Sequence, residues 1–131
     1  MVIDSSAVLA ILLEEPETAD FLAAIEADGT RLMSAASVAE AGIVLEQRLG
    51  YEAGRDLDDL IREAGIEIVP VDAEQSHLAR RAFRLYGRGN HPAGLNFGDC
   101  FAYALAEARG QPLLFKGDDF SKTDIAPAVP S

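Results

Sequence analysis

Acidic residues stand at separated positions in this sequence where they could share one site. They lie outside the runs of surface charge, and they are Asp4, Glu40, Asp99, Asp118 and Asp119. Carboxylates a few ångströms apart raise one another's pKa, so a cluster of them calls for a compensating cation. An all-oxygen ligand set selects Mg²⁺ or Mn²⁺ over zinc. Such an ion activates water for phosphodiester hydrolysis and neutralises the leaving oxygen.

Each of these acids also has a purely structural interpretation. Asp4 could cap the first helix, and Asp99 could be an ordinary first-turn acid favoured by the helix dipole. Glu40 could face solvent, and Asp118 and Asp119 could be plain loop residues. The hypothesis of a site therefore depends on several acids converging at one place, not on any single one.

The elements that would position the acids alternate between strand and helix. Strands are predicted at residues 1–3, 30–33, 66–71 and 112–115, and helices at about 7–14, 16–28, 35–49, 52–64, 73–86 and 97–109. The helix-start signals are Ser5 and Ser6, then Ser34, then Asp72 with Gln75 as a capping box. The alternation predicts an α/β fold with a mainly parallel sheet covered on both faces. Ligands of such sheets bind at the carboxyl ends of the strands.

Length and composition are those of one globular domain. The chain has 131 residues, 49% of them hydrophobic and 25% charged, and we expect a single domain over residues 1–131 with an irregular tail from about residue 125. No apolar run approaches the ~20 residues of a membrane span, and no signal-peptide pattern opens the chain. The single cysteine, Cys100, predicts a reducing cytoplasmic location. No cluster of histidine and cysteine has zinc spacing.

The charge balance is strongly acidic but uneven. Eleven Lys and Arg stand against twenty-two Asp and Glu, for a net charge of −11, which opposes non-specific nucleic-acid binding and suits a basic partner. Residues 75–98 contain no acid and carry Arg80, Arg84 and Arg88. These arginines could solvate a helix face or hold a polyanion locally.

Three segments of the sequence resemble one known family. They are MVIDSSAVLAILLEEPE at the start, MSAASVAEAGIVLE in the middle, and AGLNFGDCFAYALAEARGQPLLFKGDDFSKTDI at the end. The chain resembles the PIN-domain ribonucleases, and among them the VapC-type toxins of bacterial toxin–antitoxin pairs. The resemblance covers nearly the whole chain and implies a PIN-like three-layer α/β/α sandwich.

The resemblance also implies a hydrolase that cleaves RNA with Mg²⁺ or Mn²⁺ and leaves a 5′-phosphate and a 3′-hydroxyl. Asp4 and Asp99 would be the principal metal ligands, and Glu40 would orient or deprotonate the attacking water. The family has an acid before Phe in the last turn, which favours Asp119 as the fourth acid and leaves Asp118 as the alternative. This acid would complete the metal shell, either directly or through a water molecule. Ser6 matches a hydroxyl position that steadies the acids, and Asn96 matches a polar position beside them.

The partners implied by the resemblance are RNA, a second copy of the chain and a VapB-type antitoxin. The antitoxin's basic C-terminal segment would fill the acidic groove, in keeping with the net charge of −11. No direct DNA binding is expected without the antitoxin. Because RNA must approach an acidic protein, we expect Arg80, Arg84 and Arg88 to hold phosphate near that groove.

Other families with an aspartate after the first strand fit less well. A haloacid-dehalogenase-type phosphatase needs a second Asp two residues later, where this chain has Ser6. A receiver domain needs a paired acid near the start, and a flavodoxin-like protein needs a phosphate-binding loop after the first strand. The remaining alternative is a catalytically inactive PIN-fold module that acts only by binding proteins.

Overall fold

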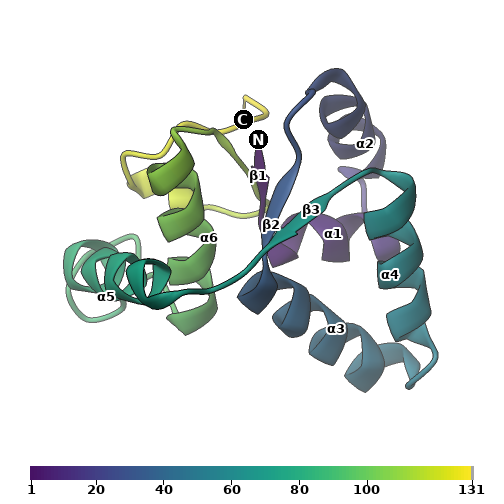
Figure 1. Ribbon diagram of the computed structural model, residues 1–131, viewed down its shortest axis with the longest axis horizontal. Helices are drawn as coiled ribbons and strands as arrows, with labels where there is room; N and C mark the ends of the chain where they lie inside the picture. The colour runs from purple at the N-terminus through teal and green to yellow at the C-terminus, as the bar shows by residue number, and fades with distance from the viewer. Residues whose placement is uncertain (131) are drawn as a thin grey trace.

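The computed structural model describes residues 1–130, and these form a parallel sheet with helices on both faces (Figure 1). The strands are β1 (Val2–Ile3), β2 (Leu32–Ser34), β3 (Glu67–Val69) and β4 (Leu113–Leu114), in the spatial order β3-β2-β1-β4. Every pairing is parallel, and Val2 lies opposite both Leu32 and Leu113. The predicted three-layer α/β/α sandwich is confirmed.

The helices begin and end close to their predicted positions. They are α1 (Ser5–Leu12), α2 (Thr18–Ala27), α3 (Ala35–Leu49), α4 (Ala53–Glu63), α5 (Ala73–Tyr86) and α6 (Phe97–Arg109). Ser34 caps α3 as predicted, whereas α1 is capped by Asp4 and not by Ser5 or Ser6. At α5 the side chain of Asp72 accepts a hydrogen bond from the backbone N–H of Gln75 at 2.9 Å.

Two shorter elements differ from the prediction for identifiable reasons. Strand β3 ends at Val69 because Pro70 has no N–H to continue the ladder. Helix α2 begins at Thr18 and not at Pro16, because Pro16 and Glu17 belong to a separate turn that is closed by the hydrogen bond from the Thr18 N–H to the Glu15 carbonyl at 3.0 Å. The Thr18 hydroxyl then donates a hydrogen bond to the carbonyl of Glu15 at 2.7 Å.

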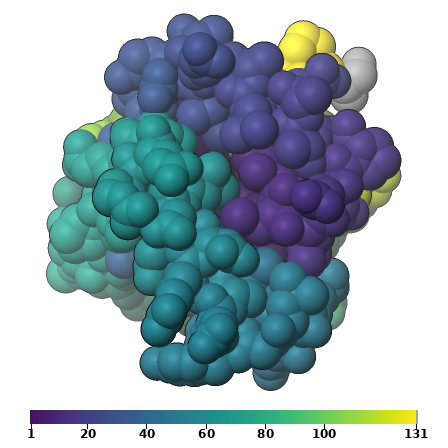
Figure 2. Space-filling model, turned by 90° about the vertical axis from the view of Figure 1, so that its right-hand side faces the viewer, coloured from purple at the N-terminus to yellow at the C-terminus, as the bar shows by residue number. Residues whose placement is uncertain are grey.

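The sheet separates two hydrophobic cores, as the alternation of side chains along a strand requires. Ile3 and Met33 face the core that the sheet forms with α1 to α4, whereas Val2 and Leu32 face the core beneath α5 and α6. Figure 2 shows the first of these sides, with the purple α1 bordered by α2 above and by the blue to teal segments of α3 and α4. No helix within residues 1–130 is long and apolar enough to cross a membrane.

The tail from about residue 125, which the sequence predicts to be irregular, follows the short 3₁₀ helix η1 (Phe120–Lys122) and contains no helix or strand up to residue 130. It is nevertheless attached to β4. Leu113 donates its N–H to the carbonyl of Ala126 at 2.9 Å and accepts from the N–H of Ala128 at 2.8 Å. Backbone hydrogen bonds therefore hold this tail beside the edge strand of the sheet.

Candidate active site

A cavity of about 220 Å³ lies at the edge of the sheet where β1 and β4 end. The polar side chains that line it include Asp4, Ser6, Glu40, Asn96, Asp99 and Asp119. They come from the end of β1, from α1, from α3, from the start of α6 and from the turn after β4. Chain segments that are far apart in sequence thus bring four carboxylates to one place, the position where parallel sheets gather ligands.

Asp4 combines a structural and a free acceptor in one carboxylate. Its Oδ2 accepts a hydrogen bond from the backbone N–H of Ser6 at 3.0 Å, which caps α1. The residue is only 2% exposed, and its Oδ1 is buried without a hydrogen-bond partner among residues 1–130. Burial raises the pKa of Asp4 to about 6, although hydrogen bonds from Ser6 oppose this effect. A buried, unpartnered carboxylate oxygen is costly and is satisfied by a cation.

Asp99 occupies the third position of α6 and forms a complete capping box with Asn96. The backbone N–H of Asn96 donates to Asp99 Oδ2 at 3.0 Å, and the backbone N–H of Asp99 donates to Asn96 Oδ1 at 2.9 Å. Burial, together with the negative charges of Asp4, Asp119 and Glu40, raises the pKa of Asp99 to about 7. The other three carboxylates are therefore close enough to Asp99 to repel its charge.

Glu40 is held from two sides. Its Oε1 accepts a hydrogen bond from the hydroxyl of Ser5 at 2.7 Å. Its carboxylate also lies against the backbone of Gly98, where a Cβ atom would approach Glu40 Oε2 to 2.3 Å. Sequence analysis identified neither Ser5 nor Gly98 as part of this site. A glycine inside a helix, directly before a candidate ligand, was the available signal, since glycine there costs stability unless space requires it.

The two adjacent acids after β4 occupy different surroundings. Asp119 lines the acidic cavity, whereas Asp118 lines a separate cavity between β4 and the tail. Ser6 links α1 to the segment after β4, because its Oγ accepts a hydrogen bond from the backbone N–H of Lys116 at 3.0 Å. Lys116 itself lines the acidic cavity and forms ion pairs with Glu15 and Glu17. Sequence analysis did not single out this lysine.

The donor set suits a hard divalent cation with few protein ligands. Within residues 1–130, no three Asp, Glu, His or Cys side chains are grouped tightly enough to hold an ion by themselves. Mg²⁺ commonly binds through one or two carboxylates and keeps several of its waters. Asp4, with its unpartnered oxygen, and Asp99, with its raised pKa, fit that role. The other acids would then act through water.

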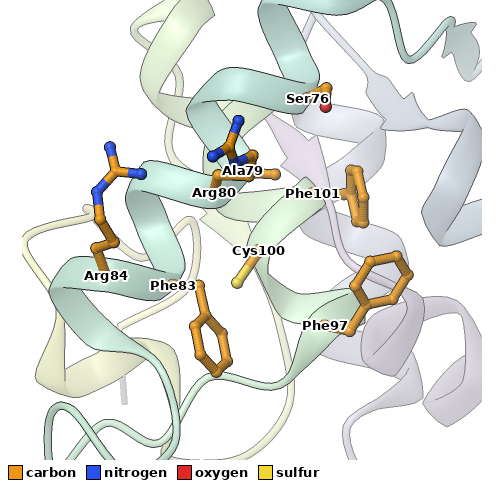
Figure 3. A pocket seen from close by; sticks show the side chains of 8 residues that line it. All are labelled: Ser76, Ala79, Arg80, Phe83, Arg84, Phe97, Cys100 and Phe101. Carbon is orange, nitrogen blue, oxygen red and sulfur yellow. The ribbon is translucent and has the colours of Figure 1, made fainter.

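The predicted phosphate-binding arginines are not at the acidic cavity. Arg80 and Arg84 line a groove between α5 and α6 (Figure 3). Arg88 is exposed in the loop after α5. Both the groove and the acidic cavity use the start of α6, because Phe97 lines the groove whereas Asp99 lines the cavity. Arg80 and Arg84 therefore line a different part of the surface from the carboxylates, and the two parts meet at the start of α6.

Comparisons with known proteins agree with this architecture. Residues 1–126 match the family model of the PIN domain. The chain is 55% identical over 126 residues to ribonuclease VapC30 of Mycobacterium tuberculosis, covering 96% of each chain. It is 52% identical to ribonuclease VapC of Mycolicibacterium smegmatis over 96% of this chain and 98% of that one. A solved structure, VapC20 of M. tuberculosis, described as a sarcin–ricin loop cleaving toxin, has the same fold, with a TM-score of 0.79 over 98% of both chains at 16% identity.

Proposed function

Since the chain belongs to the PIN-domain family and is a VapC-type ribonuclease, we propose that it hydrolyses RNA phosphodiester bonds with Mg²⁺ or Mn²⁺ bound at the acidic cavity. The observation that carries this proposal is the convergence of Asp4, Glu40, Asp99 and Asp119 on one cavity. The presence of all four acids favours a nuclease over an inactive protein-binding module.

Each side chain has a distinct proposed role. Asp4 and Asp99 would hold the cation directly, and Asp119 would hold it through one of its waters. When bound, the cation lowers the pKa of a coordinated water and neutralises charge on the phosphate. Glu40, fixed by the Ser5 hydroxyl, accepts a proton from the attacking water and orients it. The water oxygen bonds to phosphorus and the P–O3′ bond breaks. The departing 3′ oxygen takes up a proton from solvent, so the products carry a 5′-phosphate and a 3′-hydroxyl.

RNA cleavage with and without EDTA tests this proposal. We expect cleavage to stop in EDTA and to return when Mg²⁺ or Mn²⁺ is added in excess. Asp99→Asn should lower cleavage at least ~100-fold, because it removes a charged ligand from the cation. Cleavage that ignored both the chelator and this substitution would come from another nuclease or another site.

The adjacent acids after β4 offer a matched pair of variants. Asp119 lines the acidic cavity and Asp118 does not. We therefore expect Asp119→Asn to reduce cleavage at least ~10-fold and Asp118→Asn to leave it nearly unchanged. Both substitutions remove one negative charge from the same turn, so a general effect of charge on RNA binding would appear equally in both. The reverse order of the two variants would assign the fourth acid to Asp118.

We further propose a VapB-type antitoxin with a basic C-terminal segment and a homodimeric ribonuclease. The net charge of −11 and the names of the similar proteins support the antitoxin, since opposite charge speeds and orients association. Co-purification with the antitoxin should be lost at high salt if the basic segment provides most of the contact. Light scattering of the ribonuclease alone tests the dimer.

A further inference from the structure

The groove between α5 and α6 combines aromatic rings with basic side chains (Figure 3). It has a volume of about 650 Å³, within the ~300–1,000 Å³ common for small-ligand sites. The side chains that matter for its chemistry are Arg80, Phe83, Arg84, Phe97 and Phe101. None of the side chains found lining it in the described part of the chain is a carboxylate. Its chemistry is thus opposite to that of the acidic cavity nearby.

Phe97 is exposed to an unusual degree for an apolar ring. It is 78% exposed at the first position of α6. Its ring lies edge-on to the ring of Phe101, with 4.9 Å between the two ring centres. On the facing helix, Phe83 is 39% exposed. A Cβ atom at Gly87 would come within 2.6 Å of the Phe83 ring, so the backbone of Gly87 supports that ring from behind. Two supported aromatic rings therefore stand on opposite sides of one groove, and exposed apolar surface of this kind marks a binding site.

The arginines in the groove are available to a ligand. Arg81, which is next to them on α5, pairs with Glu107 of α6 at 3.0 Å. Neither Arg80 nor Arg84 has a carboxylate partner within residues 1–130. The segment 75–98 that carries them contains no acid, although the whole chain has a net charge of −11. This local charge disfavours a basic peptide and favours a polyanion.

The groove and the acidic cavity share one turn of helix. Asn96 and Asp99 face the cavity, whereas Phe97 and Phe101 face the groove. An α-helix with its side chains is about 10 Å across, and stacked nucleotides advance about 3.4 Å each. About three nucleotides of a single strand therefore reach from one site to the other.

We propose that this groove binds an unpaired nucleotide of the RNA substrate, a few positions from the cleaved bond. The base stacks on Phe97, and Arg80 and Arg84 contact the flanking phosphates. Stacking on an aromatic ring tolerates any base and requires one that is not paired in a helix. The groove thus selects single-stranded RNA by shape and charge. This inference rests on the proposed function for the identity of its ligand.

The experiment measures binding of a single-stranded oligoribonucleotide that carries the fluorescent base 2-aminopurine at successive positions. The full chain with Asp99→Asn is used so that the RNA stays intact. We expect Phe97→Ala and Phe97→Leu to weaken binding about tenfold and Phe97→Tyr to retain it, since only aromatic rings stack. The quenching of 2-aminopurine at one position should disappear in the same two variants. Arg80→Gln should reduce the slope of log affinity against log salt by about 0.7.

Tyr51 provides a matched control, because it is an aromatic residue with 84% exposure that does not line the groove. Tyr51→Ala should leave RNA affinity unchanged. Unaltered affinity and quenching in Phe97→Ala would overturn the proposal. A change from dimer to monomer in Phe97→Ala would also overturn it, since the groove would then be an interface between copies. Cleavage that is insensitive to EDTA would refute the proposed metal site alone, because the binding assay does not depend on cleavage.

Discussion

Substituting Asp99 by Asn should stabilise the metal-free protein at alkaline pH while abolishing its activity. Burial and three neighbouring carboxylates raise the pKa of Asp99 from 3.8 to about 7. At 1.36 kcal/mol per pH unit, this difference corresponds to about 4 kcal/mol of destabilisation when the group is ionised. Asp99 is only partly buried, so solvent screening reduces the expected effect to about 1–2 kcal/mol. Asparagine keeps an oxygen that can accept the hydrogen bond from Asn96 and removes the charge.

The pH dependence follows from which state binds the proton more tightly. A raised pKa means that the folded protein holds the proton of Asp99 more tightly than the unfolded chain does, so stability falls as pH rises from about 4 to 7. The gain in free energy of unfolding from Asp99→Asn should therefore reach its full size at pH 8 and be smaller by roughly 60% at pH 5. The assay is urea unfolding in EDTA at both pH values. Asp118→Asn, an exposed acid in the same part of the molecule, should change stability by less than about 0.5 kcal/mol.

Adding Mg²⁺ supplies the complementary measurement. A cation that binds only the folded state stabilises it by RT ln(1 + [Mg²⁺]/Kd). Wild-type protein at pH 8 should gain stability as Mg²⁺ is added, whereas Asp99→Asn should gain much less. If Asp99→Asn were no more stable than wild type in EDTA at pH 8, or equally more stable at pH 5, the carboxylates would not repel one another as the structure indicates.

Two further predictions concern the support of Glu40. Gly98→Ala places a methyl group where Glu40 Oε2 lies, which should displace the carboxylate and reduce cleavage about 100-fold. Gly42→Ala in α3 is the control, because its added Cβ atom would meet Leu57 at an ordinary contact distance of 3.6 Å. It should raise the melting temperature without affecting cleavage. Ser5→Ala removes the hydrogen bond to Glu40 Oε1 and should lower kcat about tenfold with little change in KM. Full activity in Gly98→Ala would exclude the proposed role of Glu40.

Periodicity predicted the fold because each element carries its own signal. The β-branched run before Pro70 and the glycines after α3 and α6 mark element ends independently of tertiary structure. The contacts of Glu40 join α1, α3 and the start of α6, so periodicity does not reveal them, and Gly98 inside a predicted helix is the local hint that the sequence offers. The exposure of Phe97 is also not visible in the sequence, because an aromatic residue at the start of a helix can be either buried or exposed. Its exposure depends on how α5 packs against α6.

In the sequence, helix capping and metal binding by Asp4 are alternatives. In the structure, Asp4 caps the helix with one carboxylate oxygen and keeps the other available for a cation. Asp4 caps α1 through Oδ2 and leaves Oδ1 unpartnered among the described residues, and Asp99 belongs to the capping box of α6. Both helices therefore direct backbone N–H groups and the positive end of their dipoles toward the acidic cavity. This partly offsets the repulsion among the four carboxylates, so the cavity can form before a cation binds. Removing the cap residue Asn96 should accordingly weaken both the helix and the affinity for the cation, because one contact serves both.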